Sequence, residues 1–479
     1  MRFSLFLFIV LLIFNNTIDA QQTDNVWSLQ RCIHYAIENN ISLKQDSLNA
    51  RMAKYTFNQS QYSQLPTLNT NGNYGRSFGR SINPTTNQFV DVDYNFLSAS
   101  GSANLLVFGW MQVRNTIAKN KYSLLASLAD LEQLRDDVSL NIATGFLSAL
   151  LAEEQIHVCK SQVSLSEAQL IQTKAFAESG RLPELNVAQL ESQLATDSSN
   201  LINAISNYNS SILDLKSLLN LDMSIPFTIQ LPDVTIDDAL LASSMQSEDI
   251  YQKARLHFGS IKGSEYRVNS AEKGVDAAKG NLYPQLSIGA QFGTNWASNY
   301  QTVSYTPNGY QLTGFALDST NLKKYNVYQP SYVSDVTNIP FSKQLNNNFR
   351  QTVSVNLTIP IFNGWQSQYL IRQAKINLET QKLNKFNAEL TLKQNVYKAH
   401  NNALNSIQKF NAAKHADDAA KRALDFAKKR YDVGLTSTVD FLVTQNSAFA
   451  AGYNLLSAKY DLIFKLKVID YYLGKELKL

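Results

Sequence analysis

The chain has 479 residues, of which 44% are hydrophobic and only 17% are charged, and its formal net charge is +4. This charge content is low for a soluble globular protein, yet the chain is too polar to consist of membrane helices. The net charge is too small and too scattered to indicate a nucleic-acid surface, so we expect no nucleic-acid partner.

Residues 1–20 are predicted to be a secretory signal peptide. Arg2 precedes an apolar run over residues 3–14, and Ala20 suits the last residue before cleavage. The run is too short to span a bilayer, and no later segment reaches the roughly 18 apolar residues of a membrane helix. We therefore expect the mature chain to cross the inner membrane without staying in it. Gln21 follows the cleavage site, so an N-terminal cysteine anchor is not expected.

Cys32 and Cys159 are the two cysteines of the chain. An oxidising compartment would permit a disulfide between them. Two separate buried thiols are the favoured interpretation, because unpaired cysteine is among the most buried residue types.

An internal repeat determines the predicted architecture. The sequence FGW at Phe108–Trp110 recurs as NGW at Asn363–Trp365, and Gly180 recurs as Gly434 at nearly the same spacing. LPTL and YPQL, which begin at Leu65 and Tyr283, repeat at a shorter spacing. The second copy therefore holds an insertion, which we predict to be a loop over residues 300–346.

Each copy predicts the same order of elements: helix, strand pair, very long helix, glycine break and helix. The first copy, residues 21–220, places them as a strand pair in 66–108, a long helix over 110–177 and a helix over 183–219. A linking segment follows over 221–245. The second copy, residues 246–479, has a strand pair in 284–361, a long helix over 365–431 and a helix over 437–473.

The long helices carry apolar residues at intervals of seven. The rows are Ile117, Leu124, Leu131 and Val138 in the first copy, and Ile376, Leu383, Leu390, Tyr397 and Leu404 in the second. A sustained seven-residue period predicts coiled-coil packing. A helix of this length extends over roughly 100 Å, which a compact domain cannot enclose.

The strand segments alternate apolar and polar residues. In 284–300, apolar residues from Leu286 to Trp296 alternate with small polar ones, and 349–361 and 95–108 behave similarly. One interpretation is half of a soluble sandwich. The other is a membrane barrel, which is favoured because the strands are long enough for a tilted crossing and the polar face suits a water-filled lumen. The aromatic residues that could lie at the membrane interface are Tyr74, Phe292, Trp296 and Tyr300.

Four strands cannot close a membrane barrel, and an open sheet edge is not tolerated in lipid. The chain must therefore oligomerise if it spans the membrane.

The sequence resembles the TolC-like outer-membrane efflux protein family over essentially the whole mature chain. The resemblance rests on AIENNISLKQ at 36–45, the two GW junctions, and YDVGLTSTVDFLVTQNSAFAAGYNLLSAKYDL at 431–462. It implies an α+β membrane protein with internal duplication. Three copies would build a 12-stranded β-barrel in outer-membrane lipid, with four strands from each chain, and a long α-helical coiled-coil barrel extending into the periplasm.

The resemblance also implies a function. The homotrimer would be the exit duct of a tripartite efflux or type I secretion system, joined to a periplasmic adaptor and an inner-membrane pump, without cofactor or covalent chemistry. The family's equatorial region would fall near 220–245 and near the C-terminus. The sequence names neither the cargo nor the adaptor and pump.

The two glycine breaks would be helix-to-helix turns at the periplasmic tip, where the family's channel closes at rest. Gly434 suits the positive-φ residue that ends a helix. Ser437 and Asp440 resemble a capping box, in which Asp440 replaces the usual Glu or Gln. In the first copy Gly180 has the same part, and Pro183 suits the first turn of the next helix.

The gate is predicted by carrying over the family's positions. The aspartate that matches Asp440 belongs to an acidic ring at the family's entrance, although helix capping is its principal expected role here. Tyr431 is also retained. Thr436 stands at the family's arginine, and Asn186 and Val443 stand at two of its aspartates. We therefore expect packing and neutral hydrogen bonds to hold the gate.

Two further expectations concern the turns. Arg181 is predicted to be a new partner for Asp440. Val433–Leu435 corresponds to the family's adaptor-contact turn and could also be a hydrophobic latch that ends the helix. Ser179 replaces the apolar residue before Gly180, which leaves a second docking groove in doubt.

Two other classes of protein agree less well with this sequence. An enzyme is not expected, since the five histidines lie in helical patterns without metal-ligand spacing and no nucleophile or phosphate motif occurs. A soluble periplasmic coiled-coil adaptor is the alternative function, but the duplicated strand pairs argue against it.

Overall fold

The computed structural model describes residues 25–82, 87–230 and 245–477. The predicted signal peptide, and residues 231–244 of the predicted linking segment, lie outside the described residues. The described chain forms two compact units. One comprises the described residues of 25–55, 121–270 and 378–477, and the other those of 56–120 and 271–377.

The first unit is almost entirely helical. Its long helices are α4 (Gln112–Glu178), α5 (Glu184–Leu219), α10 (Gln366–Asp432) and α11 (Thr438–Tyr472). Shorter helices are α2 (Leu29–Asn39), α3 (Ile41–Tyr62), α7 (Ser247–His257) and α8 (Gly259–Lys279). The division between the units falls within α3, α4, α8 and α10. In the part of the chain that the structure describes, no helix has the length and hydrophobicity needed to cross a bilayer.

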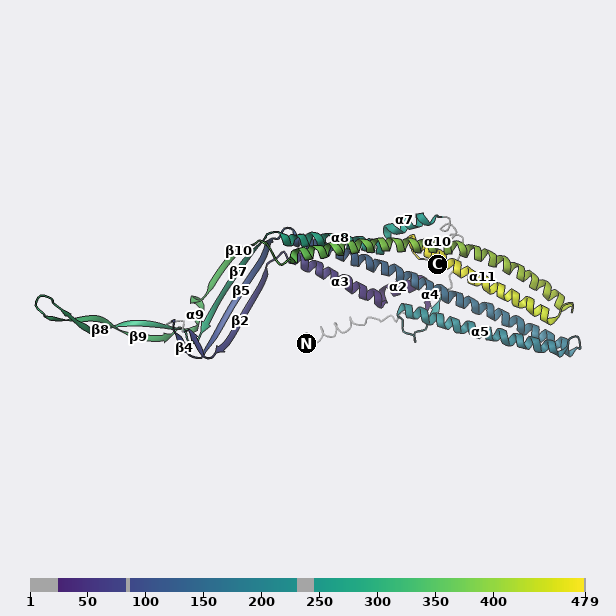
Figure 1. The fold of residues 1–479 in the computed structure, drawn as a ribbon. Helices are drawn as coiled ribbons and strands as arrows, with labels where there is room; N and C mark the ends of the chain where they lie inside the picture. Colours follow the sequence, from purple (N-terminus) through teal and green to yellow (C-terminus); the bar gives the residue numbers. More distant parts are fainter. Residues whose placement is uncertain (1–24, 83–86, 231–244, 478–479) are drawn as a thin grey trace, which may run out of the picture. The chain divides into compact units, whose positions relative to one another are not determined.

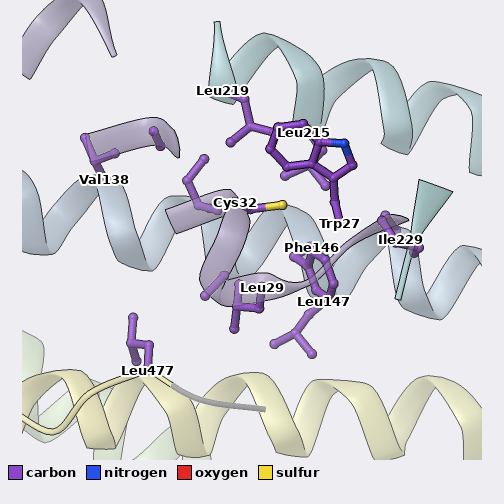
Figure 2. Close-up of a cluster of buried hydrophobic side chains, with 14 of the residues drawn as sticks. Trp27, Leu29, Cys32, Val138, Phe146, Leu147, Leu215, Leu219, Ile229 and Leu477 are labelled. Atoms are coloured by element: carbon purple, nitrogen blue, oxygen red, sulfur yellow. The ribbon is translucent and has the colours of Figure 1, made fainter. Parts of the chain in front are cut away.

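A hydrophobic core joins the N-terminal segment to the middle of α4 and to the C-terminal end of α5 (Figure 2). β1 (Val26–Trp27) pairs in parallel with β6 (Thr228–Ile229), which places Trp27 in the core. Phe146 of α4 is 1% exposed, and Leu215 and Leu219 of α5 are fully buried. Cys32 and Cys159 are buried free thiols, which agrees with the favoured interpretation of two separate cysteines.

The second unit contains one four-stranded antiparallel sheet in the order β10-β7-β5-β2 (Figure 1). Its strands are β2 (Thr67–Ser77), β5 (Tyr94–Phe108), β7 (Gln285–Ala297) and β10 (Arg350–Thr358). The edges of this sheet are β2 and β10. Two short strands, β3 (Arg80–Ile82) and β4 (Phe89–Asp91), pair with each other in the connection that joins β2 to β5 along the chain.

The strand register places apolar and polar side chains on opposite faces of this sheet. Val355 lies opposite Ile288, which lies opposite Leu105. On the other face Asn356 lies opposite Ser287. Because side chains alternate along each strand, the middle of the sheet divides in this way, although Phe96 and Leu106 lie on the polar face. The polar face carries Asn69, Asn71, Asn73, Ser98, Ser100, Ser102, Asn104, Ser287, Gln291, Asn295, Thr352, Ser354 and Asn356.

Two glycines accept aromatic rings, one on each face of the sheet. The Phe292 ring lies over Gly101 on the apolar face, and the Phe96 ring lies over Gly75 on the polar face, where a Cβ atom would clash with them. The predicted interfacial residue Phe292 is thus packed partly against its own sheet.

The insertion in the second copy is not a loop, contrary to the sequence prediction. It holds a hairpin of β8 (Gln301–Leu317) and β9 (Lys324–Asn338), followed by α9 (Phe341–Asn347). The sequence did not indicate these strands because two register shifts, between Pro307 and Tyr310 and between Leu312 and Gly314, interrupt the alternation of apolar and polar residues along β8.

Both strand-to-helix junctions use residues with positive φ. Trp110 and Met111 precede α4 with φ of 45° and 63°, and Gly364 and Trp365 precede α10 with φ of 62° and 67°. The Trp110 ring stacks on Tyr283, with ring centroids 4.3 Å apart, which holds the first junction in place.

Candidate functional site at the helix turns

The candidate site comprises the two turns that join α4 to α5 and α10 to α11. Gly180 and Gly434 have φ of 75° and 76°, a conformation that glycine adopts without steric cost. The backbone N–H of Arg181 donates to the carbonyl oxygen of Phe176, and that of Leu435 donates to the carbonyl oxygen of Arg430. Both N–O distances are 2.9 Å. This six-to-one bond defines a Schellman motif in both copies. The glycines therefore end the helices as the sequence predicts.

The capping box at the start of α11 is formed only in part. Ser437 Oγ accepts from the backbone N–H of Asp440 at 3.1 Å. The carboxylate of Asp440 accepts from that same hydroxyl at 2.7 Å, instead of reaching the backbone N–H of Ser437. In the first copy α5 begins at Glu184, one residue later than predicted. Pro183 is its N-cap residue and provides no side-chain hydrogen bond.

Tyr431 connects the two hairpins. Its side chain is 6% exposed, and its hydroxyl lies 3.0 Å from Thr173 Oγ1 of α4 and 3.4 Å from Thr438 Oγ1 of α11. Its ring stacks on Phe441 with centroids 4.7 Å apart. Gln172 adds a second link by donating to Asp432 at 3.3 Å. These contacts are one aromatic stack and hydrogen bonds, one of which ends at the carboxylate of Asp432.

Arg181 and Asp440 are not brought together within the chain. The Arg181 guanidinium lies 4.3 Å from the centroid of the Phe176 ring. Among the described residues no ion pair joins Arg181 to Asp440, whose carboxylate is held by Ser437. The predicted pairing is therefore wrong for a single copy.

The remaining predicted residues lie around the turns. Val433 is 65% exposed and Leu435 is 68% exposed, so neither acts as a buried latch in the chain. Ser179 donates its hydroxyl to Phe176 O at 3.0 Å. Asn186 and Thr436 are half-buried, and the Thr436 hydroxyl has no hydrogen-bond partner in the described chain.

A buried polar seam leads from the turns along α4, and the sequence predictions missed it. Its members are spaced at heptad positions and all are buried: Gln155, Cys159, Gln162, Ser166, Gln169 and Thr173. Glutamines recur at sevens, and so do Cys159, Ser166 and Thr173. This heptad spacing was the signal in the sequence, but the residues at these positions are polar rather than apolar.

Asp197 of α5 is the centre of the polar seam. Only 2% of it is exposed, and it accepts from Ser166 Oγ, from Gln162 at 3.2 Å and from Gln193 at 2.9 Å. Gln445 of α11 donates to Ser166 Oγ at 3.3 Å, so three helices share one network. Burial raises the pKa of the Cys159 thiol, and the nearby Asp197 charge adds to this effect.

Exposed polar pairs also join the helices close to the turns. Lys174 of α4 pairs with Glu191 of α5 at 2.9 Å. The amides of Gln193 and Asn446 bond to each other in both directions, at 3.0 and 3.1 Å, and so link α5 to α11. Within residues 25–82, 87–230 and 245–477, no group of His, Cys, Asp and Glu side chains suits a metal ion.

The comparison with known proteins decides the family. The family model described as outer membrane efflux protein matches residues 32–221 and 250–474, which include both helix turns and the four-stranded sheet. The chain belongs to the outer membrane efflux protein family.

Relatives and solved structures agree with this family. Outer membrane protein TolC of Escherichia coli (strain K12) is 21% identical over 450 residues, with 93% of this chain and 82% of TolC covered. Outer membrane efflux protein BepC of Brucella suis biovar 1 is 22% identical, covering 89% of this chain and 81% of BepC. The crystal structure of VceC from Vibrio cholerae matches with a TM-score of 0.70 and 14% identity, over 94% and 97% of the two chains.

The family fixes the fold and the location of the protein. The resemblance seen in the sequence is confirmed, as is the α+β channel fold of long helices and a strand segment. The protein is an outer-membrane protein with a periplasmic extension. The alternative of a soluble periplasmic adaptor therefore does not hold.

Proposed function

We propose that the protein is the outer-membrane exit duct of a tripartite efflux or type I secretion system. Three copies form the duct, with four strands from each in a 12-stranded barrel and the helices in a coiled-coil barrel. A periplasmic adaptor and an inner-membrane pump are its partners. The relatives support export, since BepC is named an efflux protein.

The observation that carries the homotrimer is an exposed apolar row on α10. Leu383 is 63% exposed and Leu390 is 45% exposed, and Tyr397 and Leu404 continue the row. The heptad prediction placed this row in a coiled-coil seam, but within one chain α10 packs through Leu392, Val396, Ala399 and Ala403. A second face with a seven-residue repeat suits the helix of a neighbouring copy.

The sheet supports the same assembly. Its edge strands β2 and β10 have unpaired backbone groups, and the apolar side chains of β10, such as Val353 at 76%, are exposed. A sheet in a bilayer must close without edges. Closure with the sheets of two neighbours would direct the apolar face to lipid and the uncharged Ser, Asn, Thr and Gln face to the lumen.

The helix turns would be the periplasmic gate, lined or held by Tyr431, Asp440, Thr436, Asn186 and Arg181. The exposed Val433 and Leu435 beside Gly434 offer the adaptor an apolar contact, and Ser179 and Gly180 offer a more polar one. The exposed Asp440 of three copies near one axis would favour cations.

The test is ion selectivity in planar bilayers. Asp440→Asn should lower the ratio of cation to anion permeability, whereas Asp418→Asn, which removes an exposed carboxylate of α10 away from the turn, should leave it unchanged. Equal ratios for both variants and the wild type would remove Asp440 from the entrance. Absence of any current would contradict the duct itself.

A further inference from the structure

The hairpin of β8 and β9 is amphipathic over most of its length, whereas both faces are mixed near its tip, where Phe315 and Leu317 pair with Asn326 and Lys324. The strands pair from Gln301–Asn338 to Leu317–Lys324, and two register shifts in β8 keep the alternation of both strands in phase. Since side chains alternate along a strand, one face can be read from the register. It carries Val303, Tyr305, Pro307, Tyr310, Leu312, Phe315 and Leu317 of β8, and Val336, Ser334, Tyr332, Pro330, Tyr328, Asn326 and Lys324 of β9.

This apolar hairpin face is exposed in the chain. Tyr305, Tyr310 and Phe315 are 67%, 75% and 60% exposed, and Tyr332 is 57% exposed. The opposite face is mainly polar, with Thr302, Ser304, Thr306, Gln311, Gln329, Asp335 and Thr337 beside Tyr325, Val327 and Val333. A contiguous exposed apolar surface of this kind marks an interaction site.

The apolar hairpin face, and not the edge of either strand, is the surface suited to contact another molecule. Pro307 and Pro330 lack the N–H that an added strand would need, and the two register shifts bend β8 away from a straight edge. No charged residue occurs in β8, so nothing in that strand opposes contact through the face.

The size of the face indicates the occupant. Its paired length is about 48 Å and its width about 10 Å, so the footprint is about 480 Å². A stable complex of free proteins buries about 800 Å² on each partner. The planar footprint is smaller than the accessible area of the protruding side chains, so the face suffices for a partner that another interface already holds close.

We infer that the apolar hairpin faces of neighbouring copies pack against one another outside the bilayer. The inference rests on the proposed homotrimer, whose exposed α10 row and free sheet edges would hold the copies together. In a trimer the three apolar hairpin faces turn toward one another around the axis, so that each contacts the same face of its two neighbours and the aromatic side chains are removed from water. The hairpins then form a collar at the exit of the duct.

Cysteine cross-linking of the full-length protein tests this. The native thiols are replaced as Cys32→Ala and Cys159→Ser, and Tyr332→Cys is introduced on the apolar hairpin face. Gln329→Cys, on the opposite face of the same strand, is the matched control. Tyr310→Cys is a second probe in case Tyr332→Cys does not fold. A short bis-maleimide is added, and native mass spectrometry of the same samples counts the copies.

We expect about tenfold more covalently linked copies with Tyr332→Cys than with Gln329→Cys, because the effective concentration between held copies is high. Assemblies of three copies with equal or absent cross-linking at both positions would overturn the inference and leave the proposed duct intact. Protection of Tyr332→Cys by added phospholipid vesicles, without cross-links, would assign the face to lipid and also overturn it. Single copies throughout would overturn the homotrimer and the inference with it.

Discussion

The ring of Tyr431 lies nearly parallel to the ring of Phe441, with an angle of 14° between the ring planes and 4.7 Å between their centroids. The stack joins the last turn of α10 to the first turn of α11 across the break at Gly434. The hydroxyl of the same tyrosine reaches Thr173 in the other hairpin. One side chain thus holds its own turn and links it to the neighbouring hairpin.

Tyr431→Phe should lower the free energy of unfolding by about 1 kcal/mol, because the fully buried Thr173 hydroxyl loses a hydrogen-bond partner while the stack remains. Phe441→Ala should cost about 3–5 kcal/mol, since it removes a ring that is 1% exposed. Denaturant unfolding followed by circular dichroism measures both. Tyr369→Phe, at a 53% exposed tyrosine, is the control and should change nothing. Equal losses for the two tip variants would contradict separate roles for ring and hydroxyl.

Gly434→Ala should destabilise the protein by roughly 1–2 kcal/mol, because alanine resists a positive φ. Gly434→Asn should cost less, since asparagine tolerates this conformation better. Gly274→Ala, inside α8 and without a close neighbour, should be neutral or stabilise by roughly 0.5–1 kcal/mol. Thermal unfolding of the three variants measures the order. A change in stability of the same sign and size for Gly434→Ala and Gly274→Ala would argue against strain at the turn.

Asp197→Ala should cost roughly 1–3 kcal/mol, because Ser166, Gln162 and Gln193 lose a buried acceptor. Glu191→Ala on the same helix should cost at most about 1 kcal/mol, because its pair with Lys174 is half exposed to solvent. Urea unfolding of the two variants gives the comparison. A larger loss for Glu191→Ala would mean that the polar seam does not hold α4 to α5.

Glu248 should make the docking of α7 on α10 sensitive to acid. Hydrogen bonds from Gln252, Tyr397 and Lys393 lower the pKa of its carboxyl group to about 2. In the unfolded chain this pKa is about 4.3. The folded value is the lower one, so the stabilisation is complete above about pH 4.3 and is lost as the pH falls toward 2.

Thermal midpoints of the wild type and of Glu248→Gln, measured from pH 6 to pH 2, test this. The gap between the two proteins should narrow as the pH falls through this window. Because Glu248 is exposed, we expect a small effect that added salt reduces further. A gap that stays constant with pH would show that the Lys393 and Tyr397 contacts do not depend on the carboxylate charge.

Local sequence patterns predicted much of this fold. The period of two along residues 284–300 predicted the two-faced sheet, because the alternation has a direct meaning in a strand. The glycines at 180 and 434 predicted the Schellman turns, because few other residues adopt that conformation. The tyrosine at 431 was selected through the family resemblance, and the structure gives it contacts to three other side chains.

The errors arose where the partner of a side chain lies far away in the sequence. The row through Leu390 and Leu404 has the right period for a coiled-coil seam, but a period does not reveal which helix lies opposite. The burial of Asp197 could not be predicted from its neighbours in the sequence, because two of its three donors, Gln162 and Ser166, lie on another helix. Arg181 was paired with Asp440 by charge alone, whereas in the structure it lies over Phe176.

Single-channel recording in planar bilayers tests the central claim, that the protein is a duct closed at its helix turns. The comparison is between the wild type and Gly180→Pro/Gly434→Pro, since proline can neither adopt a positive φ nor donate the backbone bond that closes each turn. We predict small stepwise currents from the wild type and larger ones from the variant. No currents from either protein, together with solubility in the absence of detergent, would contradict the account.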